Sequence, residues 1–216
     1  MIRRAVILAT FAALVGCTAS TPPASNAPDE PIESMFAEDP DEAAQKSLDA
    51  FTSLVTEEDF AALGFDSLEE VADAQLGEPL QVSMVPLDLL KEFTQETDPN
   101  ELLQDGNRVI YPVTVNDEVR SSLEIGPIGG GWQGTTFGSP ELIRPLAEQR
   151  ARAEDFVVWV PALNMYFMAV RDGEQLILTP AFDYPEADLV TGRTQPASDV
   201  FAAIQPLAAN HDELPT

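Results

Sequence analysis

The sequence predicts an α+β domain in which helices cover an antiparallel sheet. Segments with helical spacing of apolar residues lie at the beginning, the middle and the end of the chain, and alternating segments lie between them. The alternating segments follow one another through turn residues, which favours hairpins over parallel βαβ units. We therefore expect a meander, a second hairpin, N-terminal helices, a middle helix and a C-terminal helix.

The N-terminal helices are predicted from capping residues and one apolar stripe. Asp39 can cap a helix that begins at Pro40, and Glu42 can complete a capping box. The apolar residues that follow recur at helical spacing: Ala44, Leu48, Phe51 and Val55. A second short helix is expected from Thr56 to Gly64, and a capping box at residues 67–70 begins a third.

The next part of the chain has the pattern of strands. Residues 80–84 alternate between apolar and polar side chains, as a half-buried strand does. A short helix over residues 86–93 and a polar loop to Gly106 come next. Residues 109–115 and 119–125 alternate again, so the sequence predicts a hairpin.

The register of this hairpin follows from which side chains share a face. A two-residue turn would set Val113 opposite Arg120 and mix the two faces. We therefore expect Val115 to pair with Val119 across a three-residue loop. Pro112 cannot donate a ladder hydrogen bond, which predicts an edge or a bulge at this position.

A glycine-rich turn over residues 126–131 leads to a third strand, expected at residues 132–137. Ser139-Pro140 opens the middle helix, whose apolar face consists of Leu142, Ile143, Leu146 and Ala147. Residues 156–160 and 165–170 are apolar at every position, which is typical of strands covered on both faces.

The second hairpin and the last helix complete the predicted domain. Asp172-Gly173 is a strong turn signal, and a two-residue register would place Arg171 across from Glu174. Residues 176–179 complete the hairpin, and a closing helix is expected at residues 196–209. The spacing of Tyr, Val and Asp in residues 111–117 recurs in residues 166–172; this hints at a duplicated hairpin, although chance explains three matches about as well.

The charge of the chain is strongly negative. It has 37 acidic and 11 basic residues, a formal net charge of −26, and Lys46 and Lys91 as its lysines. Such a surface repels nucleic acid and anionic lipid headgroups, so no nucleic-acid partner is expected. It also acts as a solubilising surface.

The first 17 residues form the pattern of a secretory signal. A basic start, Arg3-Arg4, precedes an apolar run that is too short to cross a bilayer, which needs roughly 20 apolar residues. The run ends in Leu14-Val15-Gly16-Cys17, which resembles the lipobox of bacterial lipoprotein precursors and contains the only cysteine of the chain.

The lipobox resemblance implies that Cys17 carries a diacylglyceryl group and that cleavage precedes it. The new amino terminus then receives an acyl chain such as palmitate, and two or three chains make a stable anchor. Thr18 is not the aspartate that retains many such proteins at the inner membrane, so an outer-membrane position facing the periplasm or the outside is expected. The alternative is ordinary secretion with cleavage near Ala19.

The expected organisation has four parts. Residues 1–16 form the signal peptide, and residues 17–38 form the lipidated cysteine and a proline-rich disordered tether. Residues 39–210 form a single α+β domain, and residues 211–216 form a tail. The stretch from Gln75 to Thr179 also resembles uncharacterised bacterial secreted proteins, a resemblance that implies no function for any residue.

The residue types of most catalytic sites are scarce. His211 is the only histidine and lies in the tail, Cys17 is used by the lipid, and no GxSxG motif occurs, so we assign no catalytic residue. Counts of His and Cys exclude a zinc site built from them. A Ser–Lys site with Lys46 or Lys91 is conceivable, but solvated lysines explain both.

Binding motifs are equally sparse, and no cofactor or metal is expected. The polar loop that contains Asp98, Glu101 and Asp105 lacks the spacing of a calcium loop. The glycines before Trp132 lack the Gly-Lys-Ser/Thr of a phosphate loop and indicate a turn. Trp132 and Trp159 could line a ligand surface, although aromatic residues in strands are more often core.

Three functional hypotheses remain open. The first is a non-enzymatic binding or adaptor module, anchored to the membrane through Cys17, with an envelope protein as its partner. The second is an envelope hydrolase of glycans or peptides, which requires two facing carboxylates with one raised pKa. The third is a structural or chaperone-like component whose sheet edge near Pro112 pairs with another chain.

Overall fold

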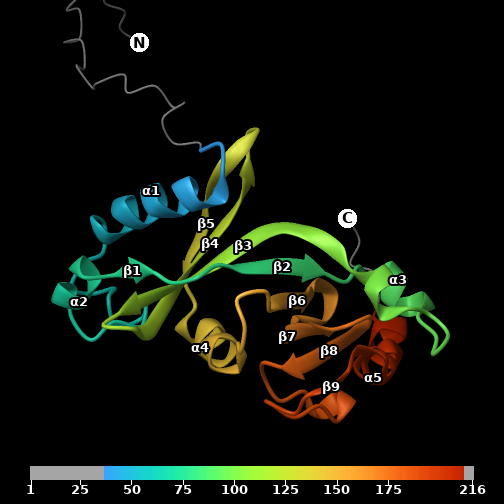
Figure 1. The fold of residues 1–216 in the computed structure, drawn as a ribbon. Helices are drawn as coiled ribbons and strands as arrows, with labels where there is room; N and C mark the ends of the chain where they lie inside the picture. Colours follow the sequence, from blue (N-terminus) through green and yellow to red (C-terminus); the bar gives the residue numbers. More distant parts are fainter. Residues whose placement is uncertain (1–36, 212–216) are drawn as a thin grey trace, which may run out of the picture. The chain divides into compact units, whose positions relative to one another are not determined.

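The computed structural model describes residues 37–211, which contain five α-helices and a nine-stranded sheet (Figure 1). The strands are β1 (Gln75–Leu76), β2 (Leu80–Met84), β3 (Gln104–Val115), β4 (Glu118–Ile128), β5 (Gly131–Gly138), β6 (Phe156–Val160), β7 (Met165–Asp172), β8 (Gln175–Pro180) and β9 (Gln195–Pro196). The helices are α1 (Pro40–Thr52), α2 (Leu68–Ala72), α3 (Leu87–Glu92), α4 (Pro140–Gln149) and α5 (Ala197–Asn210). Three short 3₁₀ segments are η2 (Pro99–Leu102), η3 (Pro161–Leu163) and η4 (Pro185–Ala187).

The predicted α+β class with an antiparallel sheet is confirmed. The signal peptide, the lipidated cysteine and nearly all of the tether lie outside the described residues, as do residues 212–216 of the tail.

The sheet consists of two antiparallel halves joined by one parallel contact. Across the sheet the order is β5-β4-β3-β2-β6-β7-β8-β9, and β1 pairs with β3 next to β2. Strands β2 and β6 are parallel, and every other pairing is antiparallel. The two ends of this order are β5 and β9, and β1 is also paired on one side only.

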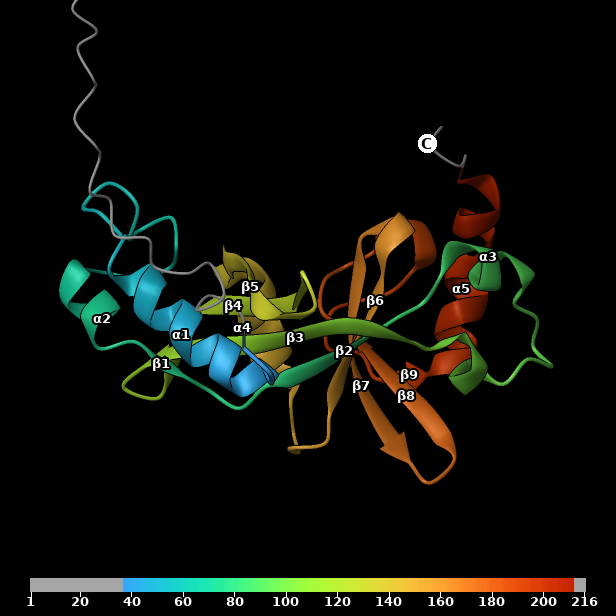
Figure 2. The ribbon, with the colours of Figure 1, turned by 90° about the horizontal axis from the view of Figure 1, so that it is seen from above.

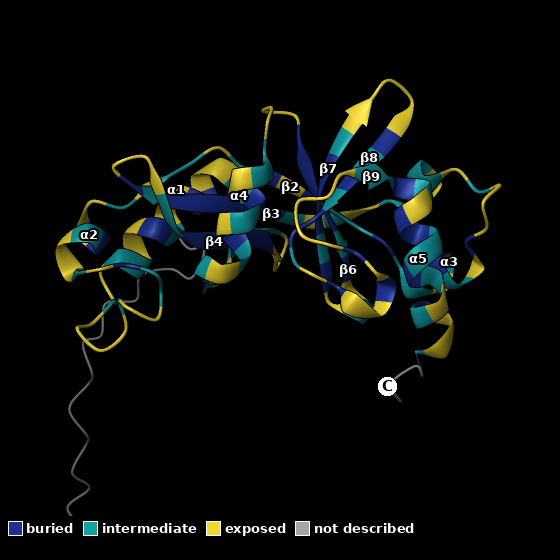
Figure 3. Cartoon of the chain, turned by 90° about the horizontal axis from the view of Figure 1, so that it is seen from below, coloured by how far each residue is buried: buried dark blue, intermediate teal, exposed yellow. Residues whose placement is uncertain are grey.

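Helices cover both faces of the sheet (Figures 1 and 2). Helix α1 packs against β4 and β5, α5 packs against β8 and β9, and α4 packs against β4 and β7. Side chains alternate along the strands: Val82 and Val157 pack with Ile143 of α4, whereas Val158 packs on the other face with Phe201 of α5. Buried residues line the strands between these helices, and exposed residues gather at the hairpin ends (Figure 3).

The two halves of the sheet share one arrangement, four strands followed by a helix. The first half runs from β2 to β5 and α4, and the second runs from β6 to β9 and α5. Residues 82–86 read VSMVP and residues 157–161 read VVWVP, and these two segments pair with each other in register. Residues 143–147 in α4 read IRPLA, and residues 204–208 in α5 read IQPLA. The sequence and the topology together therefore indicate an internal repeat.

The spacing match between residues 111–117 and 166–172 does not mark equivalent positions of this repeat. The β3–β4 turn begins at Asn116, five residues after Tyr111, whereas the β7–β8 turn begins at Gly173, seven residues after Tyr166.

Helix α1 begins as its capping residues predict. The Asp39 carboxylate accepts a hydrogen bond from the Glu42 backbone N–H at 2.9 Å. Ala44 and Leu48 are buried, and Phe51 is half-buried near the end of the helix. This stripe holds α1 on the sheet.

The helix expected from Thr56 to Gly64 is wrong, because this segment is a series of turns. The Thr56 hydroxyl accepts a hydrogen bond from the Glu58 backbone N–H at 3.3 Å, a local side chain–backbone bond that competes with helix formation. Gly64 has a φ of +97°, which only glycine adopts readily, and the chain reverses so that the Phe65 N–H reaches the Phe60 carbonyl at 3.0 Å.

The loop between β3 and β4 is shorter than expected. Val115 pairs with Glu118, so the expected pairing of Val115 with Val119 is wrong. The turn residues are Asn116 and Asp117, whose φ angles of +51° and +64° are those that a type I′ turn needs. Asn and Asp tolerate this region better than other residues with side chains.

A β-bulge resolves the mixing of faces that a two-residue turn produces. Thr114 pairs with Val119 and Val113 pairs with Ser121, so Arg120 is the extra residue of β4. Beyond the bulge the apolar side chains of β4 face α1 again.

Pro112 lies inside the sheet and not at its edge, because β3 has neighbours on both sides. It faces the interruption between β1 and β2, where its carbonyl accepts a hydrogen bond from Gly77 N–H at 2.7 Å. Neither β1 nor β2 pairs with Pro112 on this side, so no ladder hydrogen bond requires its N–H.

The second hairpin has its turn one residue later than expected. Asp172 pairs with Gln175 and Arg171 with Leu176, so the turn residues are Gly173 and Glu174. The expected pairing of Arg171 with Glu174 is therefore wrong. Gly173 supplies the positive φ of +62°.

One partly buried hydrogen bond ties α1 to the centre of the sheet. The hydroxyl of Tyr111 on β3 donates to the carboxylate of Asp41 in α1 at 2.6 Å. Burial, together with this bond and the nearby carboxylates, raises the pKa of Tyr111 far above its usual range. The phenol therefore stays a donor at any physiological pH.

We expect Tyr111→Phe to lower the free energy of unfolding by about 1–2 kcal/mol, because it removes a hydrogen bond to a charged acceptor. Chemical denaturation of Tyr111→Phe, Asp41→Asn and the double variant measures the coupling between the two side chains. Additive effects of the two substitutions would contradict a direct bond.

Candidate functional site

An apolar groove lies between α1 and the edge strand β5, and it is called here the α1–β5 groove. Its volume is about 520 Å³. One wall belongs to α1 and the residues after it, and the other belongs to the sheet: Lys46, Ser47, Ala50, Phe51, Leu54, Leu123, Gln133, Gly134, Thr135, Thr136 and Phe137.

Aromatic and aliphatic side chains form the apolar part of this groove. The rings of Phe51 and Phe137 stack with their planes 13° apart, and Phe65 lies 6.5 Å from Phe137. Leu54 follows the last turn of α1 and is 74% exposed, the largest exposure of any large apolar side chain among the described residues. A second hollow of about 260 Å³ also contains Phe51 and Leu54 and extends the groove toward Leu63.

The groove runs along an open backbone edge. At one end of β5, Trp132 exchanges two backbone hydrogen bonds with Ala37, at 3.1 and 2.9 Å. Further along, the Gly134 N–H donates to the hydroxyl of Ser47 at 3.1 Å instead of to a strand. A bulge at Thr135 twists this edge, as edge strands often do to limit indiscriminate pairing.

The groove therefore combines two kinds of recognition. Its apolar side chains can bury large apolar groups, and its strand edge can hydrogen-bond the backbone of an extended chain. Lys46 at its rim is already paired with Glu42 at 2.7 Å, and both side chains are about half exposed, so this ion pair adds little.

A row of charged and aromatic side chains crosses the opposite face of the sheet. Arg108 pairs with Glu124 at 3.2 Å, and its guanidinium carbon lies 4.6 Å from the centre of the Trp159 ring. Trp159 in turn stacks on Tyr166, with 5.9 Å between ring centres. The Trp159 ring is thus engaged by two neighbouring side chains of the protein, which favours a structural role for Trp159 over a ligand platform.

The carboxyl group of Glu124 is buried within this row. Burial raises its pKa, and the charge of Arg108 opposes that rise. Tyr166 also has a raised pKa, because it is buried and close to Glu124.

The hydrolase hypothesis requires two carboxyl groups that face each other, one of them with a raised pKa. Glu124 has the raised pKa, but it faces Arg108 and not a second carboxylate. The carboxylates that do converge belong to Asp66, Glu70 and Glu118, and they surround Arg120 at 2.9–3.3 Å. This cluster joins α2 to the bulge of β4, so its geometry is that of a structural ion-pair network.

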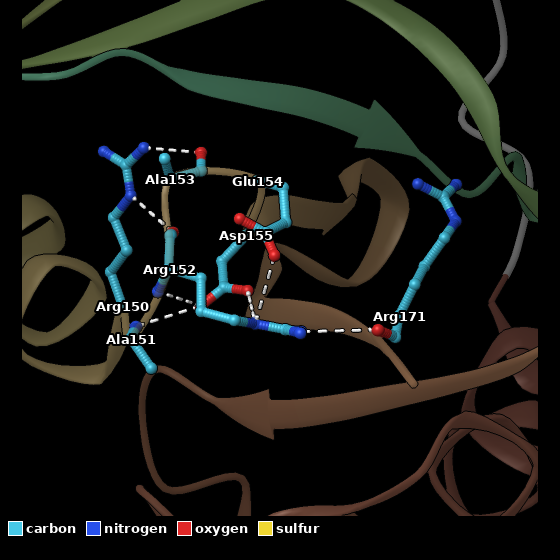
Figure 4. Close-up of polar contacts among 7 residues, drawn as sticks. All are labelled: Arg150, Ala151, Arg152, Ala153, Glu154, Asp155 and Arg171. Carbon is cyan, nitrogen blue, oxygen red and sulfur yellow. Dashed lines mark hydrogen bonds and ion pairs between the residues drawn. The ribbon is translucent and has the colours of Figure 1, made fainter. Parts of the chain in front are cut away.

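Three arginines gather near the loop between α4 and β6, and hydrogen bonds within the protein occupy two of them (Figure 4). Arg150 donates to the carbonyls of Arg152 and Ala153 at 3.1 and 2.7 Å. Asp155 accepts hydrogen bonds from the Ala151 and Arg152 backbone N–H groups, both at 2.9 Å, and from the Arg152 guanidinium at 3.2 Å. The guanidinium of the third, Arg171, lies over the Phe156 ring. The loop is thus held by its own polar groups.

The structure separates the residues that the sequence singled out. Asp98 accepts a bond from Asn100 N–H and Asp105 from Asn107 N–H, each capping its own turn. Within residues 37–211 no cluster of three or more His, Cys, Asp or Glu is placed to hold a metal ion. Lys91 lies in α3, and His211 follows α5 at the last described position.

The residues of the α1–β5 groove were not identified from the sequence. Phe51 was predicted as part of a buried stripe, and Phe137 as the end of a strand. The available signal was Leu54, an apolar residue just outside that stripe, but only the folded chain brings it near β5.

Among the described helices none has both the length and the apolar character needed to cross a membrane. No protein-family model, curated protein or solved structure matches this chain. The geometry of its own residues therefore carries the functional argument.

The buried carboxyl of Glu124 should make stability depend on pH. Its pKa is raised in the folded state, so the folded chain holds this proton to a higher pH than the unfolded chain does. The resulting stabilisation is complete below the ordinary carboxyl pKa of 4.5 and is lost as the pH rises through the folded-state pKa.

Glu124→Gln cannot titrate, so its unfolding free energy should rise relative to wild type between pH 4 and pH 7. Denaturation of both proteins across this range measures the difference. A difference that stays constant with pH would contradict the raised pKa.

Proposed function

We propose that this chain is a lipid-anchored, non-enzymatic binding module of the cell envelope. Its ligand is an extended, apolar segment of an envelope protein, and the α1–β5 groove is the binding site. The observation that carries this proposal is the combination of an apolar hollow of about 520 Å³ with an open strand edge. Strand addition uses both, since the backbone supplies affinity and alternate side chains supply specificity.

The groove replaces the edge at Pro112 as the place where strand addition is proposed. Strand β3 has partners on both sides, whereas β5 is the end of the strand order. In the chaperone-like hypothesis, too, the proposed site of strand addition is then the α1–β5 groove.

The anchor is proposed from the leader alone. Leu14-Val15-Gly16-Cys17 has the spacing of a lipobox, and Thr18 favours the outer membrane. Removal of residues 1–16 deletes two arginines and shifts the formal charge from −26 to −28. Because this charge repels anionic headgroups, the lipid and not the protein surface would hold such a chain at the membrane.

We expect Cys17→Ala to move the protein from the membrane fraction to the soluble fraction, because the lipid can no longer be attached. Fractionation of cells that express wild type and variant measures this change. Membrane association that persists in the variant would contradict lipid anchoring through Cys17.

We expect a photo-crosslinking amino acid at position 54 to capture one dominant envelope protein in intact cells. The matched control carries the same group at Val190, which is 49% exposed outside the groove. Mass spectrometry of the captured products identifies the partner. Equal capture from both positions, or none, would contradict the groove as the binding site.

Leu54→Glu gives an independent check of the same site, because this substitution in the groove should abolish binding of the partner. An exposed position tolerates such a change within about 0.5 kcal/mol of stability, so lost binding would not reflect unfolding.

A further inference from the structure

The hydrogen bonds between Ala37 and Trp132 set the direction of the chain beside β5. The Ala37 N–H donates to the Trp132 carbonyl at 3.1 Å, and the Trp132 N–H donates to the Ala37 carbonyl at 2.9 Å. The pair is antiparallel, and Ala37 is only 4% exposed. An antiparallel ladder repeats such doubly bonded pairs every second residue. Extended by two residues, this ladder would place position 35 opposite Gly134.

The edge of β5 at Gly134 is shaped to accept that extension. The Gly134 N–H donates to the Ser47 hydroxyl, which takes the place of a strand carbonyl. The lack of a side chain matters here, because a Cβ on Gly134 would lie 2.7 Å from the Ser47 oxygen. A rotation of the Ser47 side chain would free this N–H for a backbone partner.

The sequence immediately before Ala37 has the residues to fill the groove. Residues 32–36, which lie outside the described residues, read Ile-Glu-Ser-Met-Phe. Side chains two apart in a strand share a face, and Ala37 packs in the core beneath α1. In this register Met35 would share that face.

We propose that residues 32–36 of the same chain dock in the α1–β5 groove as an added antiparallel strand. The site is then self-occluded, and an envelope partner must displace this strand to bind. The docked position extends the register observed at Ala37, whereas its regulatory meaning rests on the proposed function. The displaced strand would continue directly into the tether, so displacement from the groove would lengthen the tether by residues 32–36.

A disulfide tests the register directly. The chain with Cys17→Ala has no other thiol, and Ser34→Cys with Thr135→Cys then pairs two residues that face each other in the proposed ladder. Residues opposite each other in such ladders have Cα atoms about 4.5–5.5 Å apart, within the range of a disulfide. The control pairs Ser34→Cys with Gln45→Cys, an exposed residue of α1 that does not line the groove.

We expect air oxidation of the 34/135 pair to be at least about tenfold faster than that of the control, because docking raises the effective concentration of the thiols. Mass spectrometry under non-reducing conditions measures the rates. Equal rates would overturn the docked strand.

Occlusion is tested with Nile red, a neutral apolar dye. Met35→Asp should tighten Nile red binding by about tenfold, because a buried aspartate disfavours the docked strand. Glu33→Gln, which adds no charge, should leave dye binding unchanged. A fast disulfide with unchanged dye binding would place the strand at the edge without filling the groove, and would overturn occlusion.

Failure of the proposed function can be distinguished from failure of self-occlusion. Capture from position 54 should increase in Met35→Asp if the partner and residues 32–36 compete. Capture that persists while the 34/135 pair oxidises no faster than its control would support the binding module and overturn self-occlusion.

Discussion

The parallel pairing of β2 with β6 is the constraint on which the rest of the structure depends. Every other strand pairing is antiparallel and joins strands on the same side of this seam. Only here do the halves meet through backbone bonds, with Val82 beside Val157 and Val85 N–H bonded to the Trp159 carbonyl at 2.8 Å. The pairing of Val82 with Val157 spans 75 residues of sequence, so closing it costs more chain entropy than closing a hairpin within one half.

Side chains reinforce this junction on the face that α4 covers. Ile143 and Leu146 of α4 pack on apolar residues of both halves. Beside them, the row from Glu124 through Arg108 to Trp159 crosses the same seam. The buried charge of Glu124 therefore has a structural reason: it orients Arg108 over the indole of the other half. This accounts for a perturbed carboxyl pKa without a catalytic role.

Local patterns were enough to predict most elements, but they did not predict the long-range pairing of these elements. Alternation located β2, β3 and β4, and capping residues located the start of α1, because each depends on neighbours in the sequence. The β3–β4 register failed because the preference of Asn116-Asp117 for a tight turn outweighed facial alternation, and a bulge at Arg120 absorbed the conflict. The groove could not be predicted, since Leu54 and Phe137 are ordinary amphipathic positions until the fold brings α1 to β5.

The internal repeat bears on how many ligands one chain can hold. Two similar halves related about the β2–β6 seam would ordinarily display two similar sites. Helix α1 breaks this equivalence, because in the described part of the chain it lies before the first half and has no counterpart before β6. A site that needs α1 as a wall is therefore monovalent. The stoichiometry of binding should then be one to one, and avidity could come only from several chains anchored side by side on the same membrane.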